Sequence, residues 1–120
     1  MEIAEERRGP VLIVKPVGRL DSNTSEEFQK RLAPMVETSA GGLVVDLSAI
    51  DYVSSAGLRV LLLAAKRTKE IRGRMALSGM APNVRQVFSL SGLLTVFEIE
   101  PDLESALARV TGASPGPEVW

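Results

Sequence analysis

The segment that most constrains the fold is a short, almost unbroken apolar run, LVVDLS at residues 43–48. A run of this kind is typical of a strand that is buried on both faces of a parallel sheet. Parallel strands need long crossover connections, which are usually helices. Amphipathic helical patterns flank the run on both sides, so the sequence predicts a layered α/β domain in which strands alternate with helices.

The other segments continue this alternation. Strands are predicted at 1–7, 11–14, 74–79 and 93–99, and helices from a cap at Asn23 or Thr24 to Gly41, at 58–71, from Pro82 to Gly92 and at 102–110. We therefore expect residues 1–111 to form a single domain with a mixed sheet, four helices and the element order β-β-α-β-α-β-α-β-α. Residues 112–120 are expected to form a disordered tail.

The composition excludes several classes of function. The chain contains neither cysteine nor histidine, so it has no thiol nucleophile, no Ser-His-Asp relay and no metal site built on these residues. An enzyme would have to work with carboxylates, lysines and hydroxyls alone, and no glycine-rich phosphate loop with its lysine is present. We therefore expect a protein that is not an enzyme and that needs no cofactor and no metal.

The charge balance and the hydropathy pattern limit the partners. Fourteen basic and fifteen acidic residues leave a net charge of −1, without the basic excess that nucleic-acid binding usually requires. No apolar run approaches the roughly 20 residues that span a bilayer. The first residues, MEIAEERRGP, lack the apolar stretch of an export signal. We expect a cytoplasmic protein that binds no nucleic acid and does not insert into a membrane.

Three loops are expected to meet at the carboxyl ends of the strands, where open α/β sheets form their sites. They are GRLDSNT at 18–24, DLSAIDYVSSAG at 46–57 and SGMAPN at 78–83. In the second loop, Ser54 and Ser55 stand directly before the long apolar helix. Either hydroxyl can cap that helix, and a phosphoryl group there would be held by the same free N–H groups and the helix dipole.

The segment DLSAIDYVSSAGLRVLLLAAK at 46–66 resembles the signature of the anti-sigma-factor antagonists, the STAS domain family. The resemblance continues through 18–28 and 81–99, so it covers nearly the whole chain. It implies a function by partner switching, in which the unphosphorylated protein binds an anti-sigma factor that is itself a serine kinase of the GHKL type. Phosphorylation by that kinase breaks the complex, and a metal-dependent (PPM-type) serine phosphatase restores it.

The resemblance also implies the site residues. The phosphorylated serine of the family matches Ser55, with Ser54 as the alternative hydroxyl, and Asp21 matches the acidic residue of the family's front loop. Residues expected to bind the partner are Asp21, Ser22, Asn23, Ser54, Ser55, Ala56, Gly57 and Arg59. The alternative function is that of a STAS-type accessory subunit of a lipid ABC transporter, in which Ser55 would serve only as a helix cap.

Overall fold

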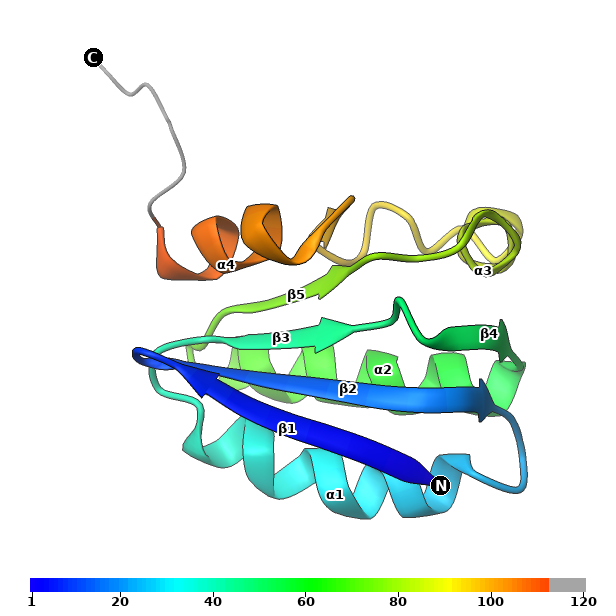
Figure 1. Ribbon diagram of the computed structural model, residues 1–120, viewed down its shortest axis with the longest axis horizontal. Coiled ribbons are helices and arrows are strands. Elements are labelled where there is room, and N and C mark those ends of the chain that lie inside the picture. Colours follow the sequence, from blue (N-terminus) through cyan, green and yellow to red (C-terminus); the bar gives the residue numbers. More distant parts are fainter. Residues whose placement is uncertain (113–120) are drawn as a thin grey trace.

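The computed structural model describes residues 1–112, in which helices pack on both faces of one mixed sheet (Figure 1). The strands are β1 (Glu2–Arg8), β2 (Val11–Leu20), β3 (Leu43–Asp46), β4 (Ile50–Val53), β5 (Met75–Ser78) and β6 (Ile99–Glu100). The helices are α1 (Ser25–Thr38), α2 (Ser55–Glu70), α3 (Pro82–Leu90) and α4 (Leu103–Thr111). The predicted α/β class, with a mixed sheet and four helices, is confirmed.

The main path of the sheet runs β1-β2-β3-β5-β6. Strands β1 and β2 form an antiparallel hairpin, whereas β2, β3, β5 and β6 pair in parallel. Strand β3 is buried along its whole length, as its apolar run predicts. Helices connect the parallel strands, and this brings the carboxyl ends of β2, β3 and β5 to one end of the molecule.

One edge of strand β2 pairs with β1. The other edge pairs first with β3 and then, beyond Pro16, with β4. The N–H of Leu12 donates to the carbonyl oxygen of Gly42, on the β3 side. The N–H of Gly18 donates to the carbonyl oxygen of Ala49, next to β4. Strand alternation turns the nitrogen of Pro16 to the same side, between the two partners. Proline is tolerated there because neither neighbour needs a donor at that position.

Two hydrophobic layers enclose the sheet. The larger layer includes the inner faces of α1, α2 and α3, and its largest fully buried side chains are those of Phe28 and Phe88. The smaller layer lies between the sheet and α4, on the opposite face from α1 and α2 (Figure 1). Its buried members are Val11, Ile13, Val44, Ala76, Ala106 and Val110.

The predicted element order lacks one strand. Residues 50–53 are predicted as part of a loop, but the structure has β4 there, parallel to the end of β2. Ile50 and Val53 are buried, whereas Asp51 and Tyr52 between them are exposed. A strand of four residues with only two apolar positions is too short for its pattern to be distinguished from a loop in the sequence.

The last predicted strand, at 93–99, is largely a turn, and only Ile99–Glu100 pairs as β6. The N–H of Leu93 donates to the carbonyl oxygen of Phe88, which folds the chain back after α3. The ring of Phe97 then packs edge-on against Phe88, with 5.5 Å between the ring centroids. The apolar residues of this segment therefore fill the core from a turn instead of a strand.

Gly112, the last residue that the structure describes, is the C-cap of α4 and has a left-handed φ of 73°. The predicted disordered tail otherwise lies outside the described residues. Within residues 1–112, no helix has both the length and the apolar character needed to cross a membrane.

Candidate functional site

The two serines predicted at the switch occupy different positions at the start of α2. Ser54 is the N-cap, is half-buried, and its side-chain oxygen accepts the N–H of Gly57 at 3.5 Å, a long hydrogen bond. Ser55 is the first residue of the helix and is exposed, and none of the hydrogen bonds in residues 1–112 involves its hydroxyl. Capping is therefore the role of Ser54, and the hydroxyl of Ser55 is presented to solvent.

Gly57 fits α2 closely against the end of β2. A Cβ atom at this position would lie 2.7 Å from the carbonyl oxygen of Leu20 and 2.8 Å from its Cβ. The same carbonyl oxygen accepts the N–H of Ser54 at 2.8 Å. Gly57 is predicted among the residues that bind a partner, but it is buried, so it contributes by setting the position of α2.

The front loop between β2 and α1 is organised by Asp21. Its Oδ1 atom accepts the N–H groups of Asn23 at 2.9 Å and Thr24 at 3.2 Å. The hydrogen bond from Asn23, with a contribution from the side chain of Arg19, holds the pKa of Asp21 below its usual value. Thr24 stands at the N-cap of α1, but its side chain makes no capping bond and donates instead to the carbonyl oxygen of Arg19.

Arg19 ties the front loop to β4. Its guanidinium carbon lies 4.3 Å from the ring centroid of Tyr52, a cation–π contact. Its Nε atom lies 3.4 Å from the carboxylate of Asp21. Neither Arg19 nor Tyr52 is among the predicted site residues, because their contact depends on the pairing of β4 with β2.

The third predicted loop joins the same end of the sheet from the side of α3. The side-chain amide of Asn83 donates to the carbonyl oxygen of Asp51 at 2.7 Å. Gly79 has a φ of 73°, and a Cβ atom there would lie 3.0 Å from the Cβ of Ser48. The second loop thus contacts both the first and the third, as the sequence predicts.

An open hollow lies between the N-terminal ends of α1 and α2. It is lined by Ser22, Ser25, Glu26, Gln29, Ser55, Ala56, Arg59, Val60 and Leu63. Four predicted site residues are among these: Ser22, Ser55, Ala56 and Arg59. Asp21 and Asn23 belong to the adjoining loop, and Ser54 caps the helix beside Ser55. The hollow therefore brings together the exposed serine, one cation from α2 and one carboxylate from α1.

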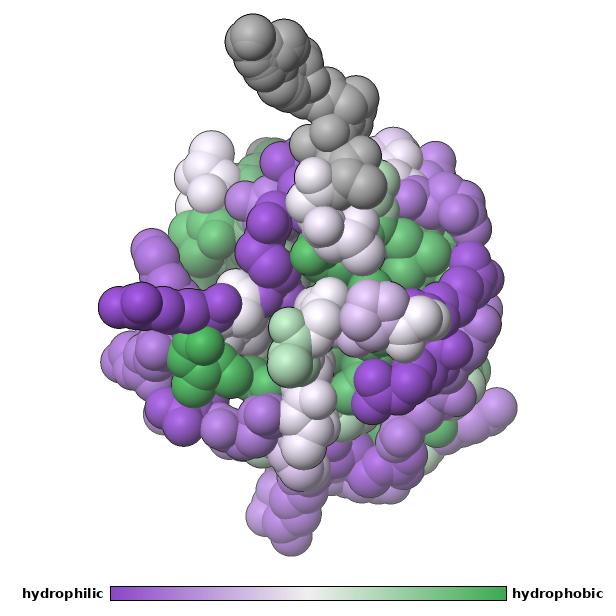
Figure 2. Space-filling model, turned by 90° about the vertical axis from the view of Figure 1, so that its left-hand side faces the viewer, coloured by the Kyte–Doolittle hydropathy of each residue, from purple (hydrophilic) through white to green (hydrophobic). Residues whose placement is uncertain are grey.

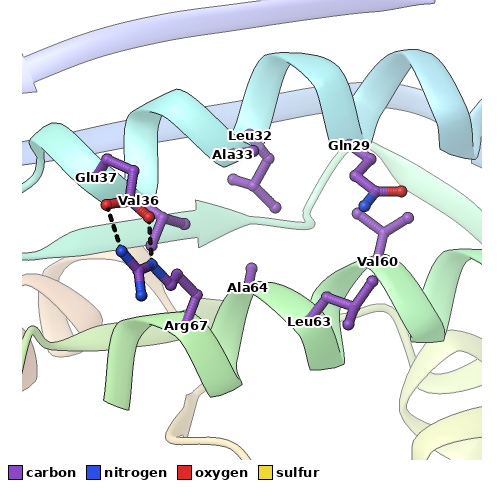
Figure 3. A pocket seen from close by; sticks show the side chains of 9 residues that line it. All are labelled: Gln29, Leu32, Ala33, Val36, Glu37, Val60, Leu63, Ala64 and Arg67. Carbon is purple, nitrogen blue, oxygen red and sulfur yellow. Dashed lines mark hydrogen bonds and ion pairs between the residues drawn. The ribbon is translucent and has the colours of Figure 1, made fainter. Parts of the chain in front are cut away.

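The hollow continues as an apolar groove along the two helices (Figure 3). The two share Gln29, Val60 and Leu63, and the groove has a volume of about 210 Å³. Its floor and walls also include Leu32, Ala33, Val36 and Ala64, and the side chain of Leu63 is 44% exposed. This groove is not predicted from the sequence, because it depends on which residues of the two helices face each other.

The far end of the groove is closed by an ion pair between Glu37 and Arg67 (Figure 3). The Nε and Nη2 atoms of Arg67 lie 2.5 Å and 3.1 Å from the two carboxylate oxygens of Glu37. This bidentate contact lowers the pKa of Glu37 and raises that of Arg67. The apolar floor therefore runs from the exposed serine at one end to a fixed ion pair at the other.

Figure 2 shows the opposite end of the molecule, where patches of hydrophobic surface are separated by hydrophilic side chains. Among residues 1–112, no group of three or more histidine, cysteine, aspartate or glutamate side chains is placed to hold a metal ion. The hollow at the start of α2 is lined by four of the predicted site residues, Ser22, Ser55, Ala56 and Arg59.

Comparison with known sequences finds the same domain family and similarly named relatives. The family model for the STAS domain matches residues 2–106. The chain is 36% identical over 115 residues to BtrV of Bordetella bronchiseptica, which is described as a candidate anti-sigma factor antagonist, and the match covers 96% of this chain and 99% of BtrV. It is also 27% identical to an anti-sigma F factor antagonist of Paenibacillus polymyxa, with 92% and 95% of the two chains covered.

Solved structures agree in fold. An anti-sigma factor antagonist from Mycobacterium paratuberculosis matches with a TM-score of 0.83 and 28% identity, over 91% of this chain and 92% of that chain. The unphosphorylated form of the anti-sigma factor antagonist SpoIIAA matches with a TM-score of 0.75. That match covers 92% of this chain and 97% of SpoIIAA at 21% identity, which supports the fold alone.

Proposed function

The chain belongs to the STAS domain family, and on this premise we propose that it is an anti-sigma-factor antagonist that works by partner switching. Its unphosphorylated form binds an anti-sigma factor that is a GHKL-type serine kinase. Phosphorylation of Ser55 by that kinase releases the antagonist, and a PPM-type serine phosphatase restores it. The chain is a substrate of both enzymes and has no catalytic role of its own.

The observation that supports this proposal is the division of roles between the two serines. Because the side chain of Ser54 caps α2, the helix does not need the hydroxyl of Ser55 for that purpose. Ser55 is exposed at the rim of the hollow, where a kinase can reach it. The first turn of α2 contains no acidic residue, so a phosphate on Ser55 would meet the positive end of the helix dipole.

The size of the charge change is sufficient for a switch. A phosphate adds about −1.5 to −2 charges at pH 7. Partner interfaces of standard size bury roughly 1,600 Å², and an unfavourable charge enclosed in one costs several kcal/mol. A difference of about 5.5 kcal/mol moves an equilibrium from almost fully bound to almost fully free. A single phosphate at the centre of the docking surface therefore accounts for release.

We place the docking surface around Ser55. Ser22 and Asn23 are exposed in the front loop, which Asp21 holds in shape through its hydrogen bonds. Ala56 and Arg59 lie on α2 beside the exposed serine. The apolar groove that continues from the hollow extends this surface along α1 and α2.

The second candidate is an accessory subunit of a lipid ABC transporter, docked permanently on an ATPase. The apolar groove between α1 and α2 favours it, because such a surface can bind a partner whatever the state of residue 55. The position of Ser54 weighs against the transporter-subunit function. That function makes Ser55 the helix cap, whereas the residue that caps α2 is Ser54.

A capture experiment from the native host distinguishes the two functions. The baits are the wild-type chain, Ser55→Ala, Ser55→Asp and Ser54→Asp, with bound proteins and phosphosites read by mass spectrometry. Ser54→Asp is the matched control, because it adds the same charge one residue away and aspartate is a good N-cap. We expect a GHKL-type kinase on every bait except Ser55→Asp, and phosphate on wild-type Ser55.

The contrary outcome is equally definite. If the same partners bind to all four baits and no phosphate is found on residue 55, the switch is wrong and the transporter-subunit function is favoured. If Ser54→Asp also loses the kinase, the charge effect is not specific to Ser55, and Ser54 contacts the partner, as the sequence predicts.

A further inference from the structure

Among residues 1–112, Arg59 is the only basic residue that lines the hollow beside Ser55. It is exposed, and within residues 1–112 it makes no ion pair. The arginine two turns further along the same helix differs, because Arg67 is held by the bidentate contact with Glu37. Within residues 1–112, the guanidinium of Arg59 therefore has no ion-pair partner and lies next to the exposed serine.

The spacing of the two residues brings their side chains together. Ser55 and Arg59 are four residues apart on α2, and such pairs are neighbours on one helix face, with about 5–6 Å between their Cβ atoms. Arginine binds phosphate through two parallel charge-assisted hydrogen bonds. A phosphate on Ser55 can therefore be reached by the guanidinium of Arg59 without movement of the backbone.

The other charged groups near the hollow do not compete for this role. Glu26, on the α1 side, would repel a phosphate. Its carboxylate forms an ion pair with Lys30, with 3.7 Å between Oε2 and Nζ. Arg19 is placed over the ring of Tyr52 and beside Asp21. A phosphate on Ser55 is thus repelled from the α1 wall and attracted to Arg59.

Given the proposed function, we propose that Arg59 is the internal counter-ion of the phosphate on Ser55 and that the switch acts through it in two ways. In the unphosphorylated protein, Arg59 is available to a carboxylate side chain of the partner. After phosphorylation, Arg59 pairs with the phosphate of its own chain. The partner then meets a new dianion and loses the cation to which it was bound.

The test uses the full chain alone. Phosphoserine is introduced at position 55 by genetic code expansion, and the phosphate is titrated by phosphorus NMR at low ionic strength, where screening is weak. Free phosphoserine has a second pKa of about 6. We expect Arg59→Gln to raise the pKa of the phosphate by roughly half a unit, the size expected for one exposed ion pair, and Arg59→Lys to raise it by less.

Arg85→Gln is the matched control, because it removes the same charge from an exposed arginine on α3, away from the hollow. It is expected to leave the titration unchanged. The same pKa in the wild-type, Arg59→Gln and Arg85→Gln proteins overturns the proposal. That result leaves the proposed function standing if Ser55→Asp still loses the kinase, because the added charge alone would then act as the switch.

Discussion

Gly57 and Leu20 are in such close contact that the start of α2 rests directly on the end of β2. The α-carbon of Gly57 faces the carbonyl oxygen and the Cβ of Leu20, and any added Cβ atom would lie within 2.8 Å of both. Leu20 itself is fully buried. The position of the exposed serine two residues earlier therefore depends on a contact that only glycine permits.

Replacing Gly57 by alanine is expected to destabilise the fold and to displace the first turn of α2. Overpacking of a buried contact costs about 1–3 kcal/mol, although alanine by itself favours a helix more than glycine does. Urea unfolding measures the loss. Ala56→Ser is the control, because it alters the neighbouring residue without adding atoms against Leu20. A Gly57→Ala protein as stable as the wild type would show that α2 and the end of β2 can move apart at little cost in free energy.

Removal of the cap at Ser54 is expected to have a different effect from removal of Ser55. Ser54→Ala should lower the free energy of unfolding by about 0.5–1 kcal/mol, at the low end of the usual range because the capping bond is long. Ser54→Asp should retain the stability, since aspartate caps as well as serine. Ser55→Ala should change stability little. Thermal unfolding of the three variants checks the order, and a larger loss for Ser55→Ala would contradict the assigned roles.

Acidification is expected to weaken the front loop through Asp21. The folded protein holds the pKa of this carboxyl below its ordinary value, chiefly through the N–H of Asn23. A carboxyl with a lowered pKa stabilises the fold at pH values above its unfolded pKa, and this contribution is lost as the pH falls through the lower folded value. Unfolding measured from about pH 5 to pH 2 should therefore depend less on pH in Asp21→Asn than in the wild type. Equal pH dependence would mean that the loop does not favour the ionised form.

Much of the fold is visible in the sequence because its signals are local. The LVVDLS run predicts the buried strand β3, and the spacing of Phe28, Leu32 and Val36 predicts the inner face of α1. Strand β4 is missed because its partner, the end of β2, lies some thirty residues earlier in the chain. The short β6 is overestimated because apolar residues that fill a core from a turn look the same as those of a strand.

In the candidate site, too, local features can be predicted from the sequence, whereas contacts between distant segments cannot. Ser54 and Ser55 can be identified from their position before an apolar helix, but which of them caps the helix requires the hydrogen bond to Gly57. The contact of Arg19 with Tyr52 and the groove floored by Ala33 and Ala64 arise only when separate elements are packed together. Sequence patterns therefore locate the site, and tertiary packing determines its shape.

The apolar groove gives a final prediction about the extent of the docking surface. Leu63 is 44% exposed where the groove meets the hollow, whereas Leu90 is 80% exposed on α3, outside both. If the partner covers the groove, Leu63→Asp should weaken binding of the kinase captured with the Ser55→Ala bait by about tenfold or more, since buried apolar anchors dominate interface energies. Leu90→Asp, which adds the same charge, should leave the affinity unchanged. Calorimetric titration of both variants in the Ser55→Ala background measures the difference, and equal affinities would show that the partner does not cover Leu63.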